Sequence, residues 1–395
     1  MSEGITLFFI LLIFYLVECI FWLHRISAAF VSCAGKHWQL IFYNKYFGND
    51  NGGIFSANPL PPLGKVYICS LLPVSFSNTH VCSQISQTLT NDIKIEKNAK
   101  SIKYDDIKSV STIDKDIFIN GNMFAKCSTP IQSIYIRDIL LKLISLNDEQ
   151  RENEIKSIML EAFNSERARK KIEAFDNKSY KLRIFCNLLF LYIFLIVPVL
   201  VYFYGTIKLF IILLVLMYFS SISVSIIFYS IHKMFYPAQK SERIIDMIKM
   251  IIFPPTAVRA NDFLSLNLLV NYHPLAVGLL LFDKINFENI AKKVLTDLKH
   301  PIINDYENEQ VDLTNKWHRS NLEKIVIDFL HNNSVDIKNL IIAPSPENIS
   351  CKSYCPRCEA QYTIQNGICS ECSNIALISF KANKVKIRKS KRRRE

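Results

Sequence analysis

The chain has 395 residues, half of them hydrophobic, with a mean hydropathy of +0.16 and a formal net charge of +12. This length allows more than one domain, and the composition is too apolar for an ordinary soluble protein and too polar for a transporter of many spans. The last fifteen residues, KANKVKIRKSKRRRE, hold nine Lys/Arg and one Glu, so they carry eight of the twelve excess positive charges. This distribution excludes a strongly basic globular surface.

Eleven cysteines are spread along the chain. Four of them have the spacing of metal ligands, and the other seven form no obvious disulfide framework. A chain of this length can build a hydrophobic core without disulfides. We therefore expect reduced cysteines that face the cytosol.

The first apolar run, ITLFFILLIFYLVECIFW at residues 5–22, is long enough to cross a bilayer. Only Glu3 precedes it, whereas positive charges follow it at Arg25, Lys36 and Lys45. This order is the reverse of a secretory signal. Cys33 in FVSCAG offers an alternative as a lipoprotein cleavage site, but His24 and Arg25 separate it from the apolar run. We predict an uncleaved transmembrane helix with its amino end outside.

Residues 26–183 are predicted to form a small cytosolic α+β domain. VYICSLL is typical of a strand, and DIFINGNMFAKC is typical of a hairpin that turns at Asn120-Gly121. Helices should follow, the first capped by Thr129 with Pro130 at its first position and Gln132 completing a capping box. A later helix, SERARKKIEAF, leads towards the membrane.

This domain contains two cysteines and a histidine that could form a metal site or a Cys/His pair: Cys69, His80 and Cys82. Their spacing matches no known pattern of either kind. We favour buried cysteines and an incidental histidine, since free cysteine commonly behaves as a small core residue.

Two further transmembrane helices are predicted at 184–204 and 209–229, joined by a tight turn. Seven Lys/Arg lie between residues 167 and 183 and four between 233 and 249, while the turn has only Lys208. The excess of positive charge on the cytoplasmic side of membrane proteins therefore places both ends of this hairpin in the cytosol. Within the spans, Glu18 is expected to reach interfacial water, and Asn187 and Pro198 to reflect helix packing and a kink.

Residues 232–340 are predicted to form a cytosolic helical region. Its first helix, SERIIDMIKMIIF, is amphipathic and should end at Pro254-Pro255. The stretch 263–282 has spanning length but contains polar residues and a proline, and crossing would place the basic tail outside. We expect a buried helix pair or a segment on the membrane surface. Arg259, Asp262 and His273 could line a site, although caps and ion pairs within a bundle are the favoured interpretation.

A linker at 341–353, stiffened by Pro344 and Pro346, precedes two CxxC pairs separated by ten residues. The cysteines are Cys355, Cys358, Cys369 and Cys372. Four thiolates complete the closed tetrahedral shell of a structural zinc site. The segment 354–380 resembles the zinc-ribbon family, which implies a structural Zn²⁺ on these four sulfurs. Cys351 could be a spare ligand, but a separate free thiol is favoured.

The polybasic tail, 381–395, has a ready partner in anionic lipid headgroups, because each cation near a charged leaflet contributes about 1 kcal/mol. Nucleic acid is a less favoured partner, since no aromatic residue is interleaved with these charges to stack on bases.

Together these patterns predict a mainly α membrane protein with three transmembrane helices, an α+β cytosolic domain, a cytosolic helical region and a zinc ribbon. We expect a membrane-anchored scaffold or interaction protein that binds a protein partner. One alternative is an enzyme or enzyme subunit with a site at the cytosolic membrane face, using Arg259, Asp262 and His273. Another is a membrane-tethered nucleic-acid-binding protein.

Overall fold

The computed structural model describes residues 3–20, 27–33, 37–42, 65–70, 72–83, 99–204, 206–301, 309–372 and 375–380. The chain folds into two compact units. The first comprises residues Met1–Phe287 and Tyr306–Asn321, and the second comprises Glu288–Asp305 and Leu322–Glu395. The basic tail, 381–395, and the Glu18 side chain lie outside the described residues.

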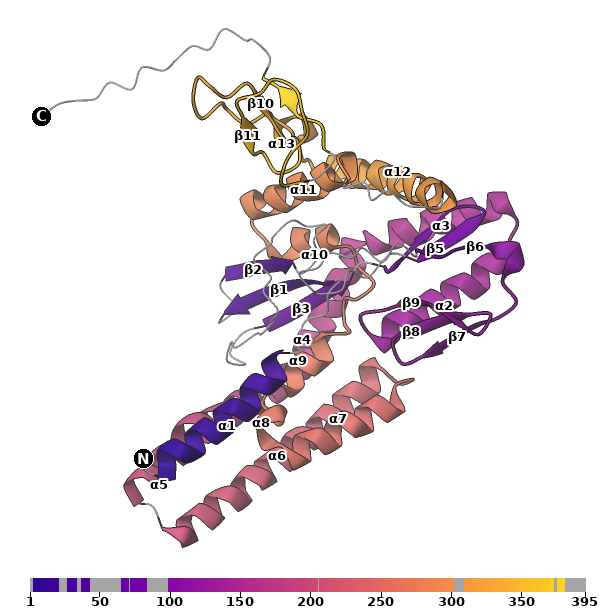
Figure 1. Ribbon diagram of the computed structural model, residues 1–395. Coiled ribbons are helices and arrows are strands. Elements are labelled where there is room, and N and C mark those ends of the chain that lie inside the picture. The colour runs from indigo at the N-terminus through magenta and orange to yellow at the C-terminus, as the bar shows by residue number, and fades with distance from the viewer. Residues whose placement is uncertain are drawn as a thin grey trace, which may run out of the picture. The chain divides into compact units, whose positions relative to one another are not determined.

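An antiparallel sheet in the first unit has the order β2-β1-β3 (Figure 1). Its strands are β1 (Ser27–Cys33), β2 (His37–Phe42) and β3 (Lys65–Ser70). Ala29 on the central strand pairs with Ile41 on one side and Ile68 on the other. The strand at VYICSLL is confirmed as β3, whereas the sequence patterns did not reveal β1 or β2.

Two more three-stranded antiparallel sheets follow along the chain. Their strands are β4 (Val74–Phe76), β5 (His80–Ser83), β6 (Ser101–Lys103), β7 (Val110–Ile113), β8 (Asp116–Ile119) and β9 (Asn122–Lys126). The predicted hairpin turn is confirmed between β8 and β9, where Asn120 and Gly121 have φ of 53° and 78°. This left-handed conformation suits a two-residue turn and explains the glycine.

The helices α2 (Pro130–Ile144) and α3 (Asp148–Ala162) come next in the chain. The cap of α2 is confirmed, since the Thr129 side chain accepts a hydrogen bond from the Gln132 amide. The Gln132 side chain accepts from the Ser128 amide and hydroxyl at 2.9 and 2.8 Å. These bonds satisfy amides that have no partner within the helix.

A helical run extends from Ser165 to Tyr204 through α4 (Ser165–Leu191), the π-helical turn η3 (Tyr192–Ile196) and α5 (Val197–Tyr204). The π turn ends two residues before Pro198, which has no amide hydrogen to donate. The Val197 amide instead bonds to the Tyr192 carbonyl, five residues back. A wide turn of this kind accommodates a proline inside a long helix.

The helix α6 (Ile207–Phe235) follows a short turn and packs against α4 and α5. Among the described residues, the run Ser165–Tyr204 and α6 are the two helices long and apolar enough to cross a membrane. The N-terminal helix α1 (Glu3–Ile20) has a shorter described apolar stretch, Ile5–Leu16.

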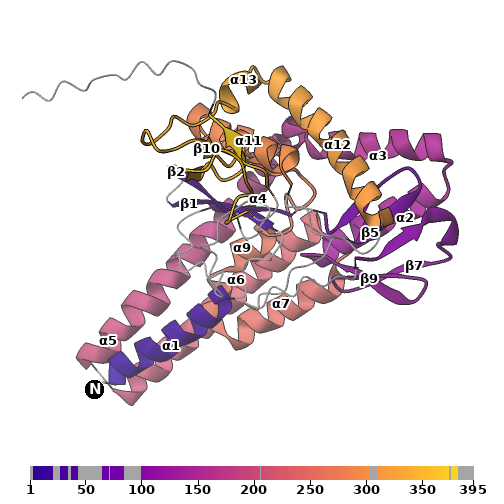
Figure 2. The same ribbon diagram turned by 45° about the horizontal axis from the view of Figure 1, so that its top comes forward.

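Helix α1 lies antiparallel to α5 (Figures 1 and 2). The amino end of α1 and the carboxyl end of α5 line a common apolar groove, formed by Ile5, Phe8, Pro198, Val199, Tyr202 and Phe203. Further along, the Tyr15 ring meets the Phe194 ring edge-on at 5.2 Å between centroids. The amino end of α1 therefore lies at the same end of the bundle as the turn between α5 and α6.

After α6 the chain turns back through α7 (Lys240–Ile252), α8 (Pro254–Ala257), α9 (Ala260–Ser265) and α10 (Pro274–Leu281). Helix α7 ends immediately before Pro254-Pro255, as predicted. The stretch 263–282 does not form one helix, because α9 ends at Ser265, near its start, and α10 begins only at Pro274. Most of its apolar side chains are buried, including Leu264, Leu269 and Leu275.

The second unit contains most of α11 (Lys284–Lys299), the later part of α12 (Glu309–Asn332) and α13 (Ile337–Leu340). A sheet of order β11-β10-β12 completes it. Its strands are β10 (Ser353–Tyr354), β11 (Gln361–Tyr362) and β12 (Ile378–Ser379). The cysteine module thus belongs to a compact unit that also includes helices.

His273 makes the first unit sensitive to acid. Its Nδ1 accepts a hydrogen bond from the Leu275 amide at 3.2 Å, and its ring stacks on Phe163 at 4.3 Å. Burial lowers the pKa of His273 to about 3. Below about pH 6.5, the ordinary pKa of histidine, the imidazole is protonated in the unfolded chain but stays neutral in the folded chain. Folding stability therefore falls as pH decreases.

We predict that His273→Asn, which keeps a capping side chain, flattens the dependence of stability on pH between 6.5 and 5. The wild type should lose about 1.4 kcal/mol more per pH unit than the variant. Thermal unfolding of the full-length protein in detergent at several pH values measures this difference. His331→Asn, at an exposed ring, is the matched control and should behave as the wild type. Equal pH slopes for wild type and His273→Asn would contradict the prediction.

Candidate metal centre

The four cysteines of the CxxC pairs lie on two turns that flank the short sheet of the second unit. Cys355 and Cys358 follow β10, and Cys369 and Cys372 lie between β11 and β12. The first turn is closed by two backbone bonds, from the Cys355 amide to the Ala360 carbonyl and from the Glu359 amide to the Cys355 carbonyl, both 2.9 Å. Both turns bring their two sulfurs into a common cluster.

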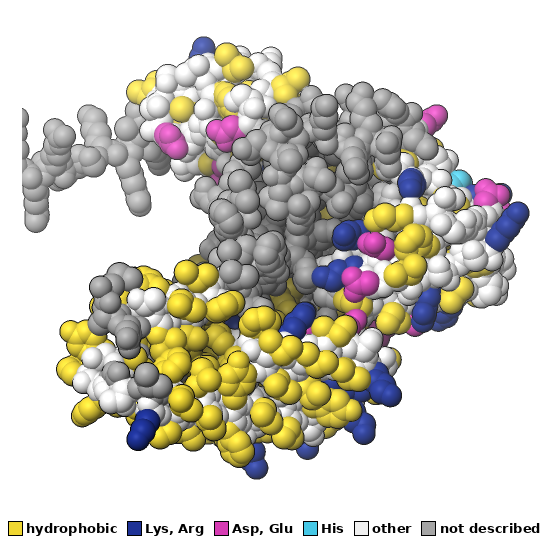
Figure 3. Space-filling view, turned by 60° about the horizontal axis from the view of Figure 1, so that its bottom comes forward, with side chains coloured by type: hydrophobic (Ala, Val, Ile, Leu, Met, Phe, Trp, Pro, Cys, Tyr) yellow, Lys and Arg dark blue, Asp and Glu magenta, His cyan; other side chains and the backbone are white. Residues whose placement is uncertain are grey.

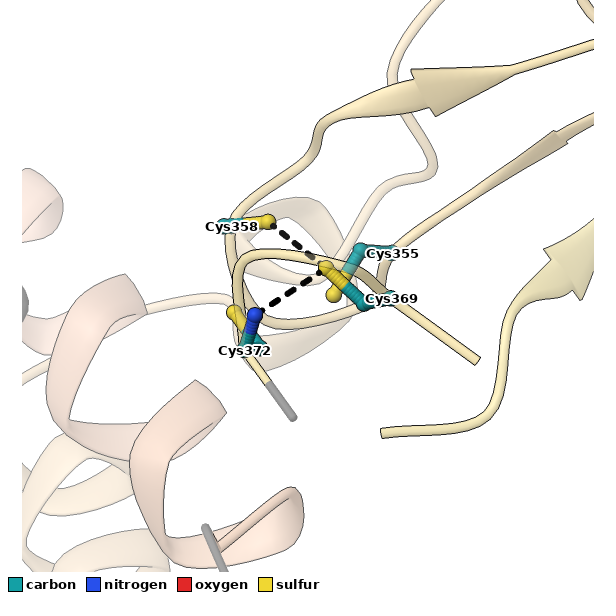
Figure 4. A group of neighbouring side chains, drawn as sticks. All are labelled: Cys355, Cys358, Cys369 and Cys372. Carbon is teal, nitrogen blue, oxygen red and sulfur yellow. Dashed lines mark hydrogen bonds between the residues drawn. The ribbon is translucent and has the colours of Figure 1, made fainter. Parts of the chain in front are cut away.

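The four sulfur atoms all lie within 4.8 Å of one another (Figure 4). The sulfurs of Cys358 and Cys369, from different pairs, are 3.6 Å apart. Four ligands in a tetrahedron, with zinc–sulfur bonds of about 2.3 Å, would be separated by about 3.8 Å. The spacing of the cluster is therefore close to that of a four-sulfur zinc site.

The surroundings of Cys358, Cys369 and Cys372 shift the pKa values of these thiols in different directions. Burial raises the pKa of Cys358 to about 12 and also raises the pKa of Cys372. Burial acts in the same direction on Cys369, but hydrogen bonds from the Tyr362 hydroxyl and the amides of Cys372 and Glu371 outweigh it and lower its pKa to about 7. A divalent cation would supply the positive charge that keeps all four groups as thiolates.

The cluster has the chemistry of a structural site. Cys355, Cys369 and Cys372 are buried, and four sulfurs fill a tetrahedral shell. Such a shell leaves no open position on the metal for water or substrate. The Tyr362 hydroxyl lies 3.1 Å from the Cys369 sulfur and would help orient this ligand. The residues present therefore fit a Zn²⁺ ion that stabilises the fold.

The first CxxC turn also docks on α11, a contact that the sequence patterns did not reveal. Arg357, between the first two cysteines, forms an ion pair with Asp297 at 2.8 Å and donates to the His300 carbonyl at 2.9 Å. The Arg357 and Asp297 side chains are only 6% and 16% exposed. Glu359 forms a second ion pair with Lys292. In the sequence, only the arginine inside the turn indicated that this turn forms an ion pair, and nothing identified Asp297 as its partner.

Cys351, the candidate spare ligand, does not join the cluster. Its sulfur lies 3.3 Å from the Asn348 side-chain oxygen. It therefore behaves as a separate free thiol, as favoured from the sequence.

The structure does not bring Cys69, His80 and Cys82 together as one site. Cys69 lies on β3 and Cys82 on β5, in different sheets, and both are fully buried. The His80 ring contacts the Thr79 hydroxyl at 2.9 Å and the Gln310 amide group at 3.2 Å. These contacts match the interpretation of core cysteines and an incidental histidine.

Arg259 and Asp262 form a buried ion pair at 2.7 Å, one turn apart along α9. Arg259 also lies 3.3 Å from the Tyr15 hydroxyl of α1. His273, in contrast, caps α10 and stacks on Phe163. These contacts are of the kind expected for pairing and capping within the bundle.

Comparison with known protein families, curated proteins and solved structures found no match to this chain. The fold and the cluster nevertheless define a class: a mainly helical protein with two helices long and apolar enough to cross a membrane, and a four-cysteine group that could hold a metal ion such as zinc.

We predict that purified, reduced protein contains about one equivalent of zinc. Cys372→Ser should lose most of it, because three sulfurs no longer close the shell. Cys351→Ser is the matched control and should retain the wild-type content, since this thiol lies outside the cluster. Elemental analysis after removal of free metal measures all three proteins. Less than roughly half an equivalent in the wild type would contradict the prediction.

Proposed function

We propose that the protein is a membrane-anchored scaffold or interaction component with its zinc ribbon and most of its mass in the cytosol. The observation that carries this proposal is the combination of two long apolar helices that expose large side chains with four cysteine sulfurs that could form a closed shell around a metal ion. The helices would fix the protein in a bilayer, and the shell would hold a folded surface for a partner rather than perform a reaction.

The surface of the two long helices supports insertion in a membrane. Only 28% of the residues in the most apolar window of each helix are buried. Large apolar side chains are exposed along both helices, among them Leu195, Val199, Phe203, Phe219 and Ile226. In water this surface would favour association or aggregation, whereas acyl chains would cover it without cost. Figure 3 shows many hydrophobic side chains gathered on one face of the molecule, with Lys and Arg at its edge.

The proposed topology has three spans, at 5–22, 184–204 and 209–229, with the amino end outside. The packing of α1 is consistent with this topology, because the amino end of α1 lies beside the carboxyl end of α5. Both would then leave the membrane on the same side. The basic residues before α5 and after α6 favour the cytosol for the opposite side.

Three Asn-x-Ser sequences test this orientation, at Asn177, Asn332 and Asn348. They match the acceptor pattern for N-glycosylation, and the Asn332 and Asn348 side chains are exposed. We predict that none is modified when the chain is expressed in eukaryotic cells, because acceptors in the cytosol do not meet the glycosylation machinery. Gel mobility before and after enzymatic deglycosylation measures this.

A positive control adds an acceptor sequence and a spacer before Met1, which should become glycosylated if the amino end is outside. The protein should also stay with membranes after extraction with alkaline carbonate. Glycosylation at any of the three natural positions would overturn the orientation, and release by carbonate would overturn the membrane proposal itself.

We further propose that the tail, 381–395, binds anionic lipid headgroups of the same membrane. Its nine basic residues and the short distance along the chain from the ribbon support this. A synthetic peptide of the tail should bind vesicles that contain phosphatidylserine and ignore neutral ones. Replacing its last four basic residues by Ala should weaken binding by about 4 kcal/mol, since each charge contributes about 1 kcal/mol.

Vesicle sedimentation at several salt concentrations measures the binding, which should fall steeply as salt increases. A single-stranded oligonucleotide serves as the competitor. If the peptide prefers the oligonucleotide over anionic vesicles at moderate salt, nucleic acid would replace lipid as the proposed partner.

A further inference from the structure

Helix α7 returns along α6 instead of leaving the bundle. The Ser221 hydroxyl of α6 donates a hydrogen bond to the Met250 carbonyl near the end of α7. The Tyr218 hydroxyl lies 3.4 Å from the Ile252 carbonyl. Both donors belong to the apolar run 209–229. Tyr218 precedes Tyr229 by eleven residues, or about 16 Å along a helix, which is roughly half of a hydrocarbon core about 30 Å thick.

The later part of α7 and the next residue, Phe253, expose large apolar side chains. Ile245, Ile248, Ile252 and Phe253 are 51%, 46%, 53% and 46% exposed. The three isoleucines repeat at intervals of three and four residues, so they share one face of the helix. The Phe253 ring lies 5.8 Å from the Phe14 ring of α1, measured between centroids. The exposed face of α7 is therefore continuous with the apolar surface of the proposed spans.

The backbone after α7 is shielded from water by the long helices. All residues from Pro254 to Ala260 are buried. The Cys186 thiol of α4 lies 3.6 Å from the Ala257 carbonyl, and the Ser221 and Tyr218 hydroxyls bond to the Met250 and Ile252 carbonyls at the end of α7. Inside a bilayer, non-helical backbone is tolerated only where protein groups satisfy and cover it. A turn in water would need no such donors.

The charges on α7 fit a helix that enters a membrane from its surface. Lys240, Glu242 and Arg243 lie at its first turns, where the chain comes from the cytosolic end of α6. Further in, Lys249 lies 3.6 Å from Asp246 and is 56% exposed. Its long side chain can reach back towards the headgroups while its stem stays among apolar residues.

We propose that residues 245–253 form a re-entrant wedge whose exposed face contacts the acyl chains of the cytosolic leaflet. The wedge enters and leaves on the cytosolic side, so it adds no further crossing. This inference rests on the proposed membrane function, and it assigns lipid, rather than a protein partner or a second copy, to the exposed face. Lipid is favoured because this face continues the surface that the bilayer would already cover.

Fluorescence quenching by lipids brominated on their acyl chains tests the wedge in the full chain, reconstituted in vesicles. The three native tryptophans, Trp22, Trp38 and Trp317, are first replaced by Phe. Single tryptophans are then introduced as Phe253→Trp in the wedge, Phe219→Trp on α6 and Leu160→Trp on α3. Emission from the first two should be roughly halved by brominated lipid, and emission from Leu160→Trp should not change.

The three positions distinguish failure of the wedge from failure of the membrane proposal. Quenching at Phe219→Trp without quenching at Phe253→Trp would overturn the wedge and leave the membrane proposal standing. No quenching at either position would overturn both. A second measurement needs no substitution: the wild-type chain is irradiated in vesicles with a lipid that carries a diazirine on its acyl chain. Lipid adducts on peptides covering 245–253 support the wedge, whereas adducts on α6 alone overturn it.

Discussion

The packing of the long helical run from Ser165 to Tyr204 is the interaction on which the first unit depends. One face of this run is fully covered at Ala168, Phe175, Leu182, Cys186 and Ile193. These residues recur at intervals of seven, seven, four and seven, so they form a single stripe along the helix. The same stripe packs against residues of the sheet and against residues of the apolar helices. A single continuous helix thereby couples the part proposed for the cytosol to the part proposed for the membrane.

Polar contacts complete this coupling at the level of the sheet. Asp176 on α4 forms an ion pair with Lys65 of β3 and accepts a hydrogen bond from the Tyr67 hydroxyl at 2.9 Å. Arg183 lies 3.7 Å from the same carboxylate. Next to this cluster, the Phe175 ring meets the Phe235 ring at the end of α6, at 5.6 Å between centroids. These contacts hold the sheet, α4 and α6 together next to the apolar parts of the two helices.

The second unit is organised around a different constraint. Its sheet strands are two residues long and cannot form a stable core by themselves. The sulfur cluster supplies that core together with Ile375 and Leu377, and the ion pair between Arg357 and Asp297 attaches the cluster to α11. Zinc would therefore stabilise both the ribbon and its position on the helix. Because four sulfurs would leave no open position on the metal, the partner that we propose would contact the surface around the cluster rather than the metal.

Much of this structure could be read from local patterns. The turn at Asn120-Gly121, the cap at Thr129, the end of α7 before Pro254, the two long apolar helices and the spacing of the four cysteines each depend on a few neighbouring residues. Local backbone and side-chain chemistry determines such features wherever they occur. Strand β1 escaped detection because Ala28, Phe30 and Val31 are buried on both sides of the strand and show no alternation.

By itself, the sequence determined where α2 begins, where α7 ends, where one hairpin turns and which sulfurs can share a metal. Only the tertiary structure decided which distant groups meet. It paired Arg357 with Asp297, placed Tyr67 against Asp176, and returned α7 to Ser221 and Tyr218 on α6. The physical reason is that local features depend on residues close in the chain. The partner of a buried charge, or of a carbonyl without a bond inside its own helix, depends instead on how whole helices and sheets pack. No short stretch of sequence encodes this packing.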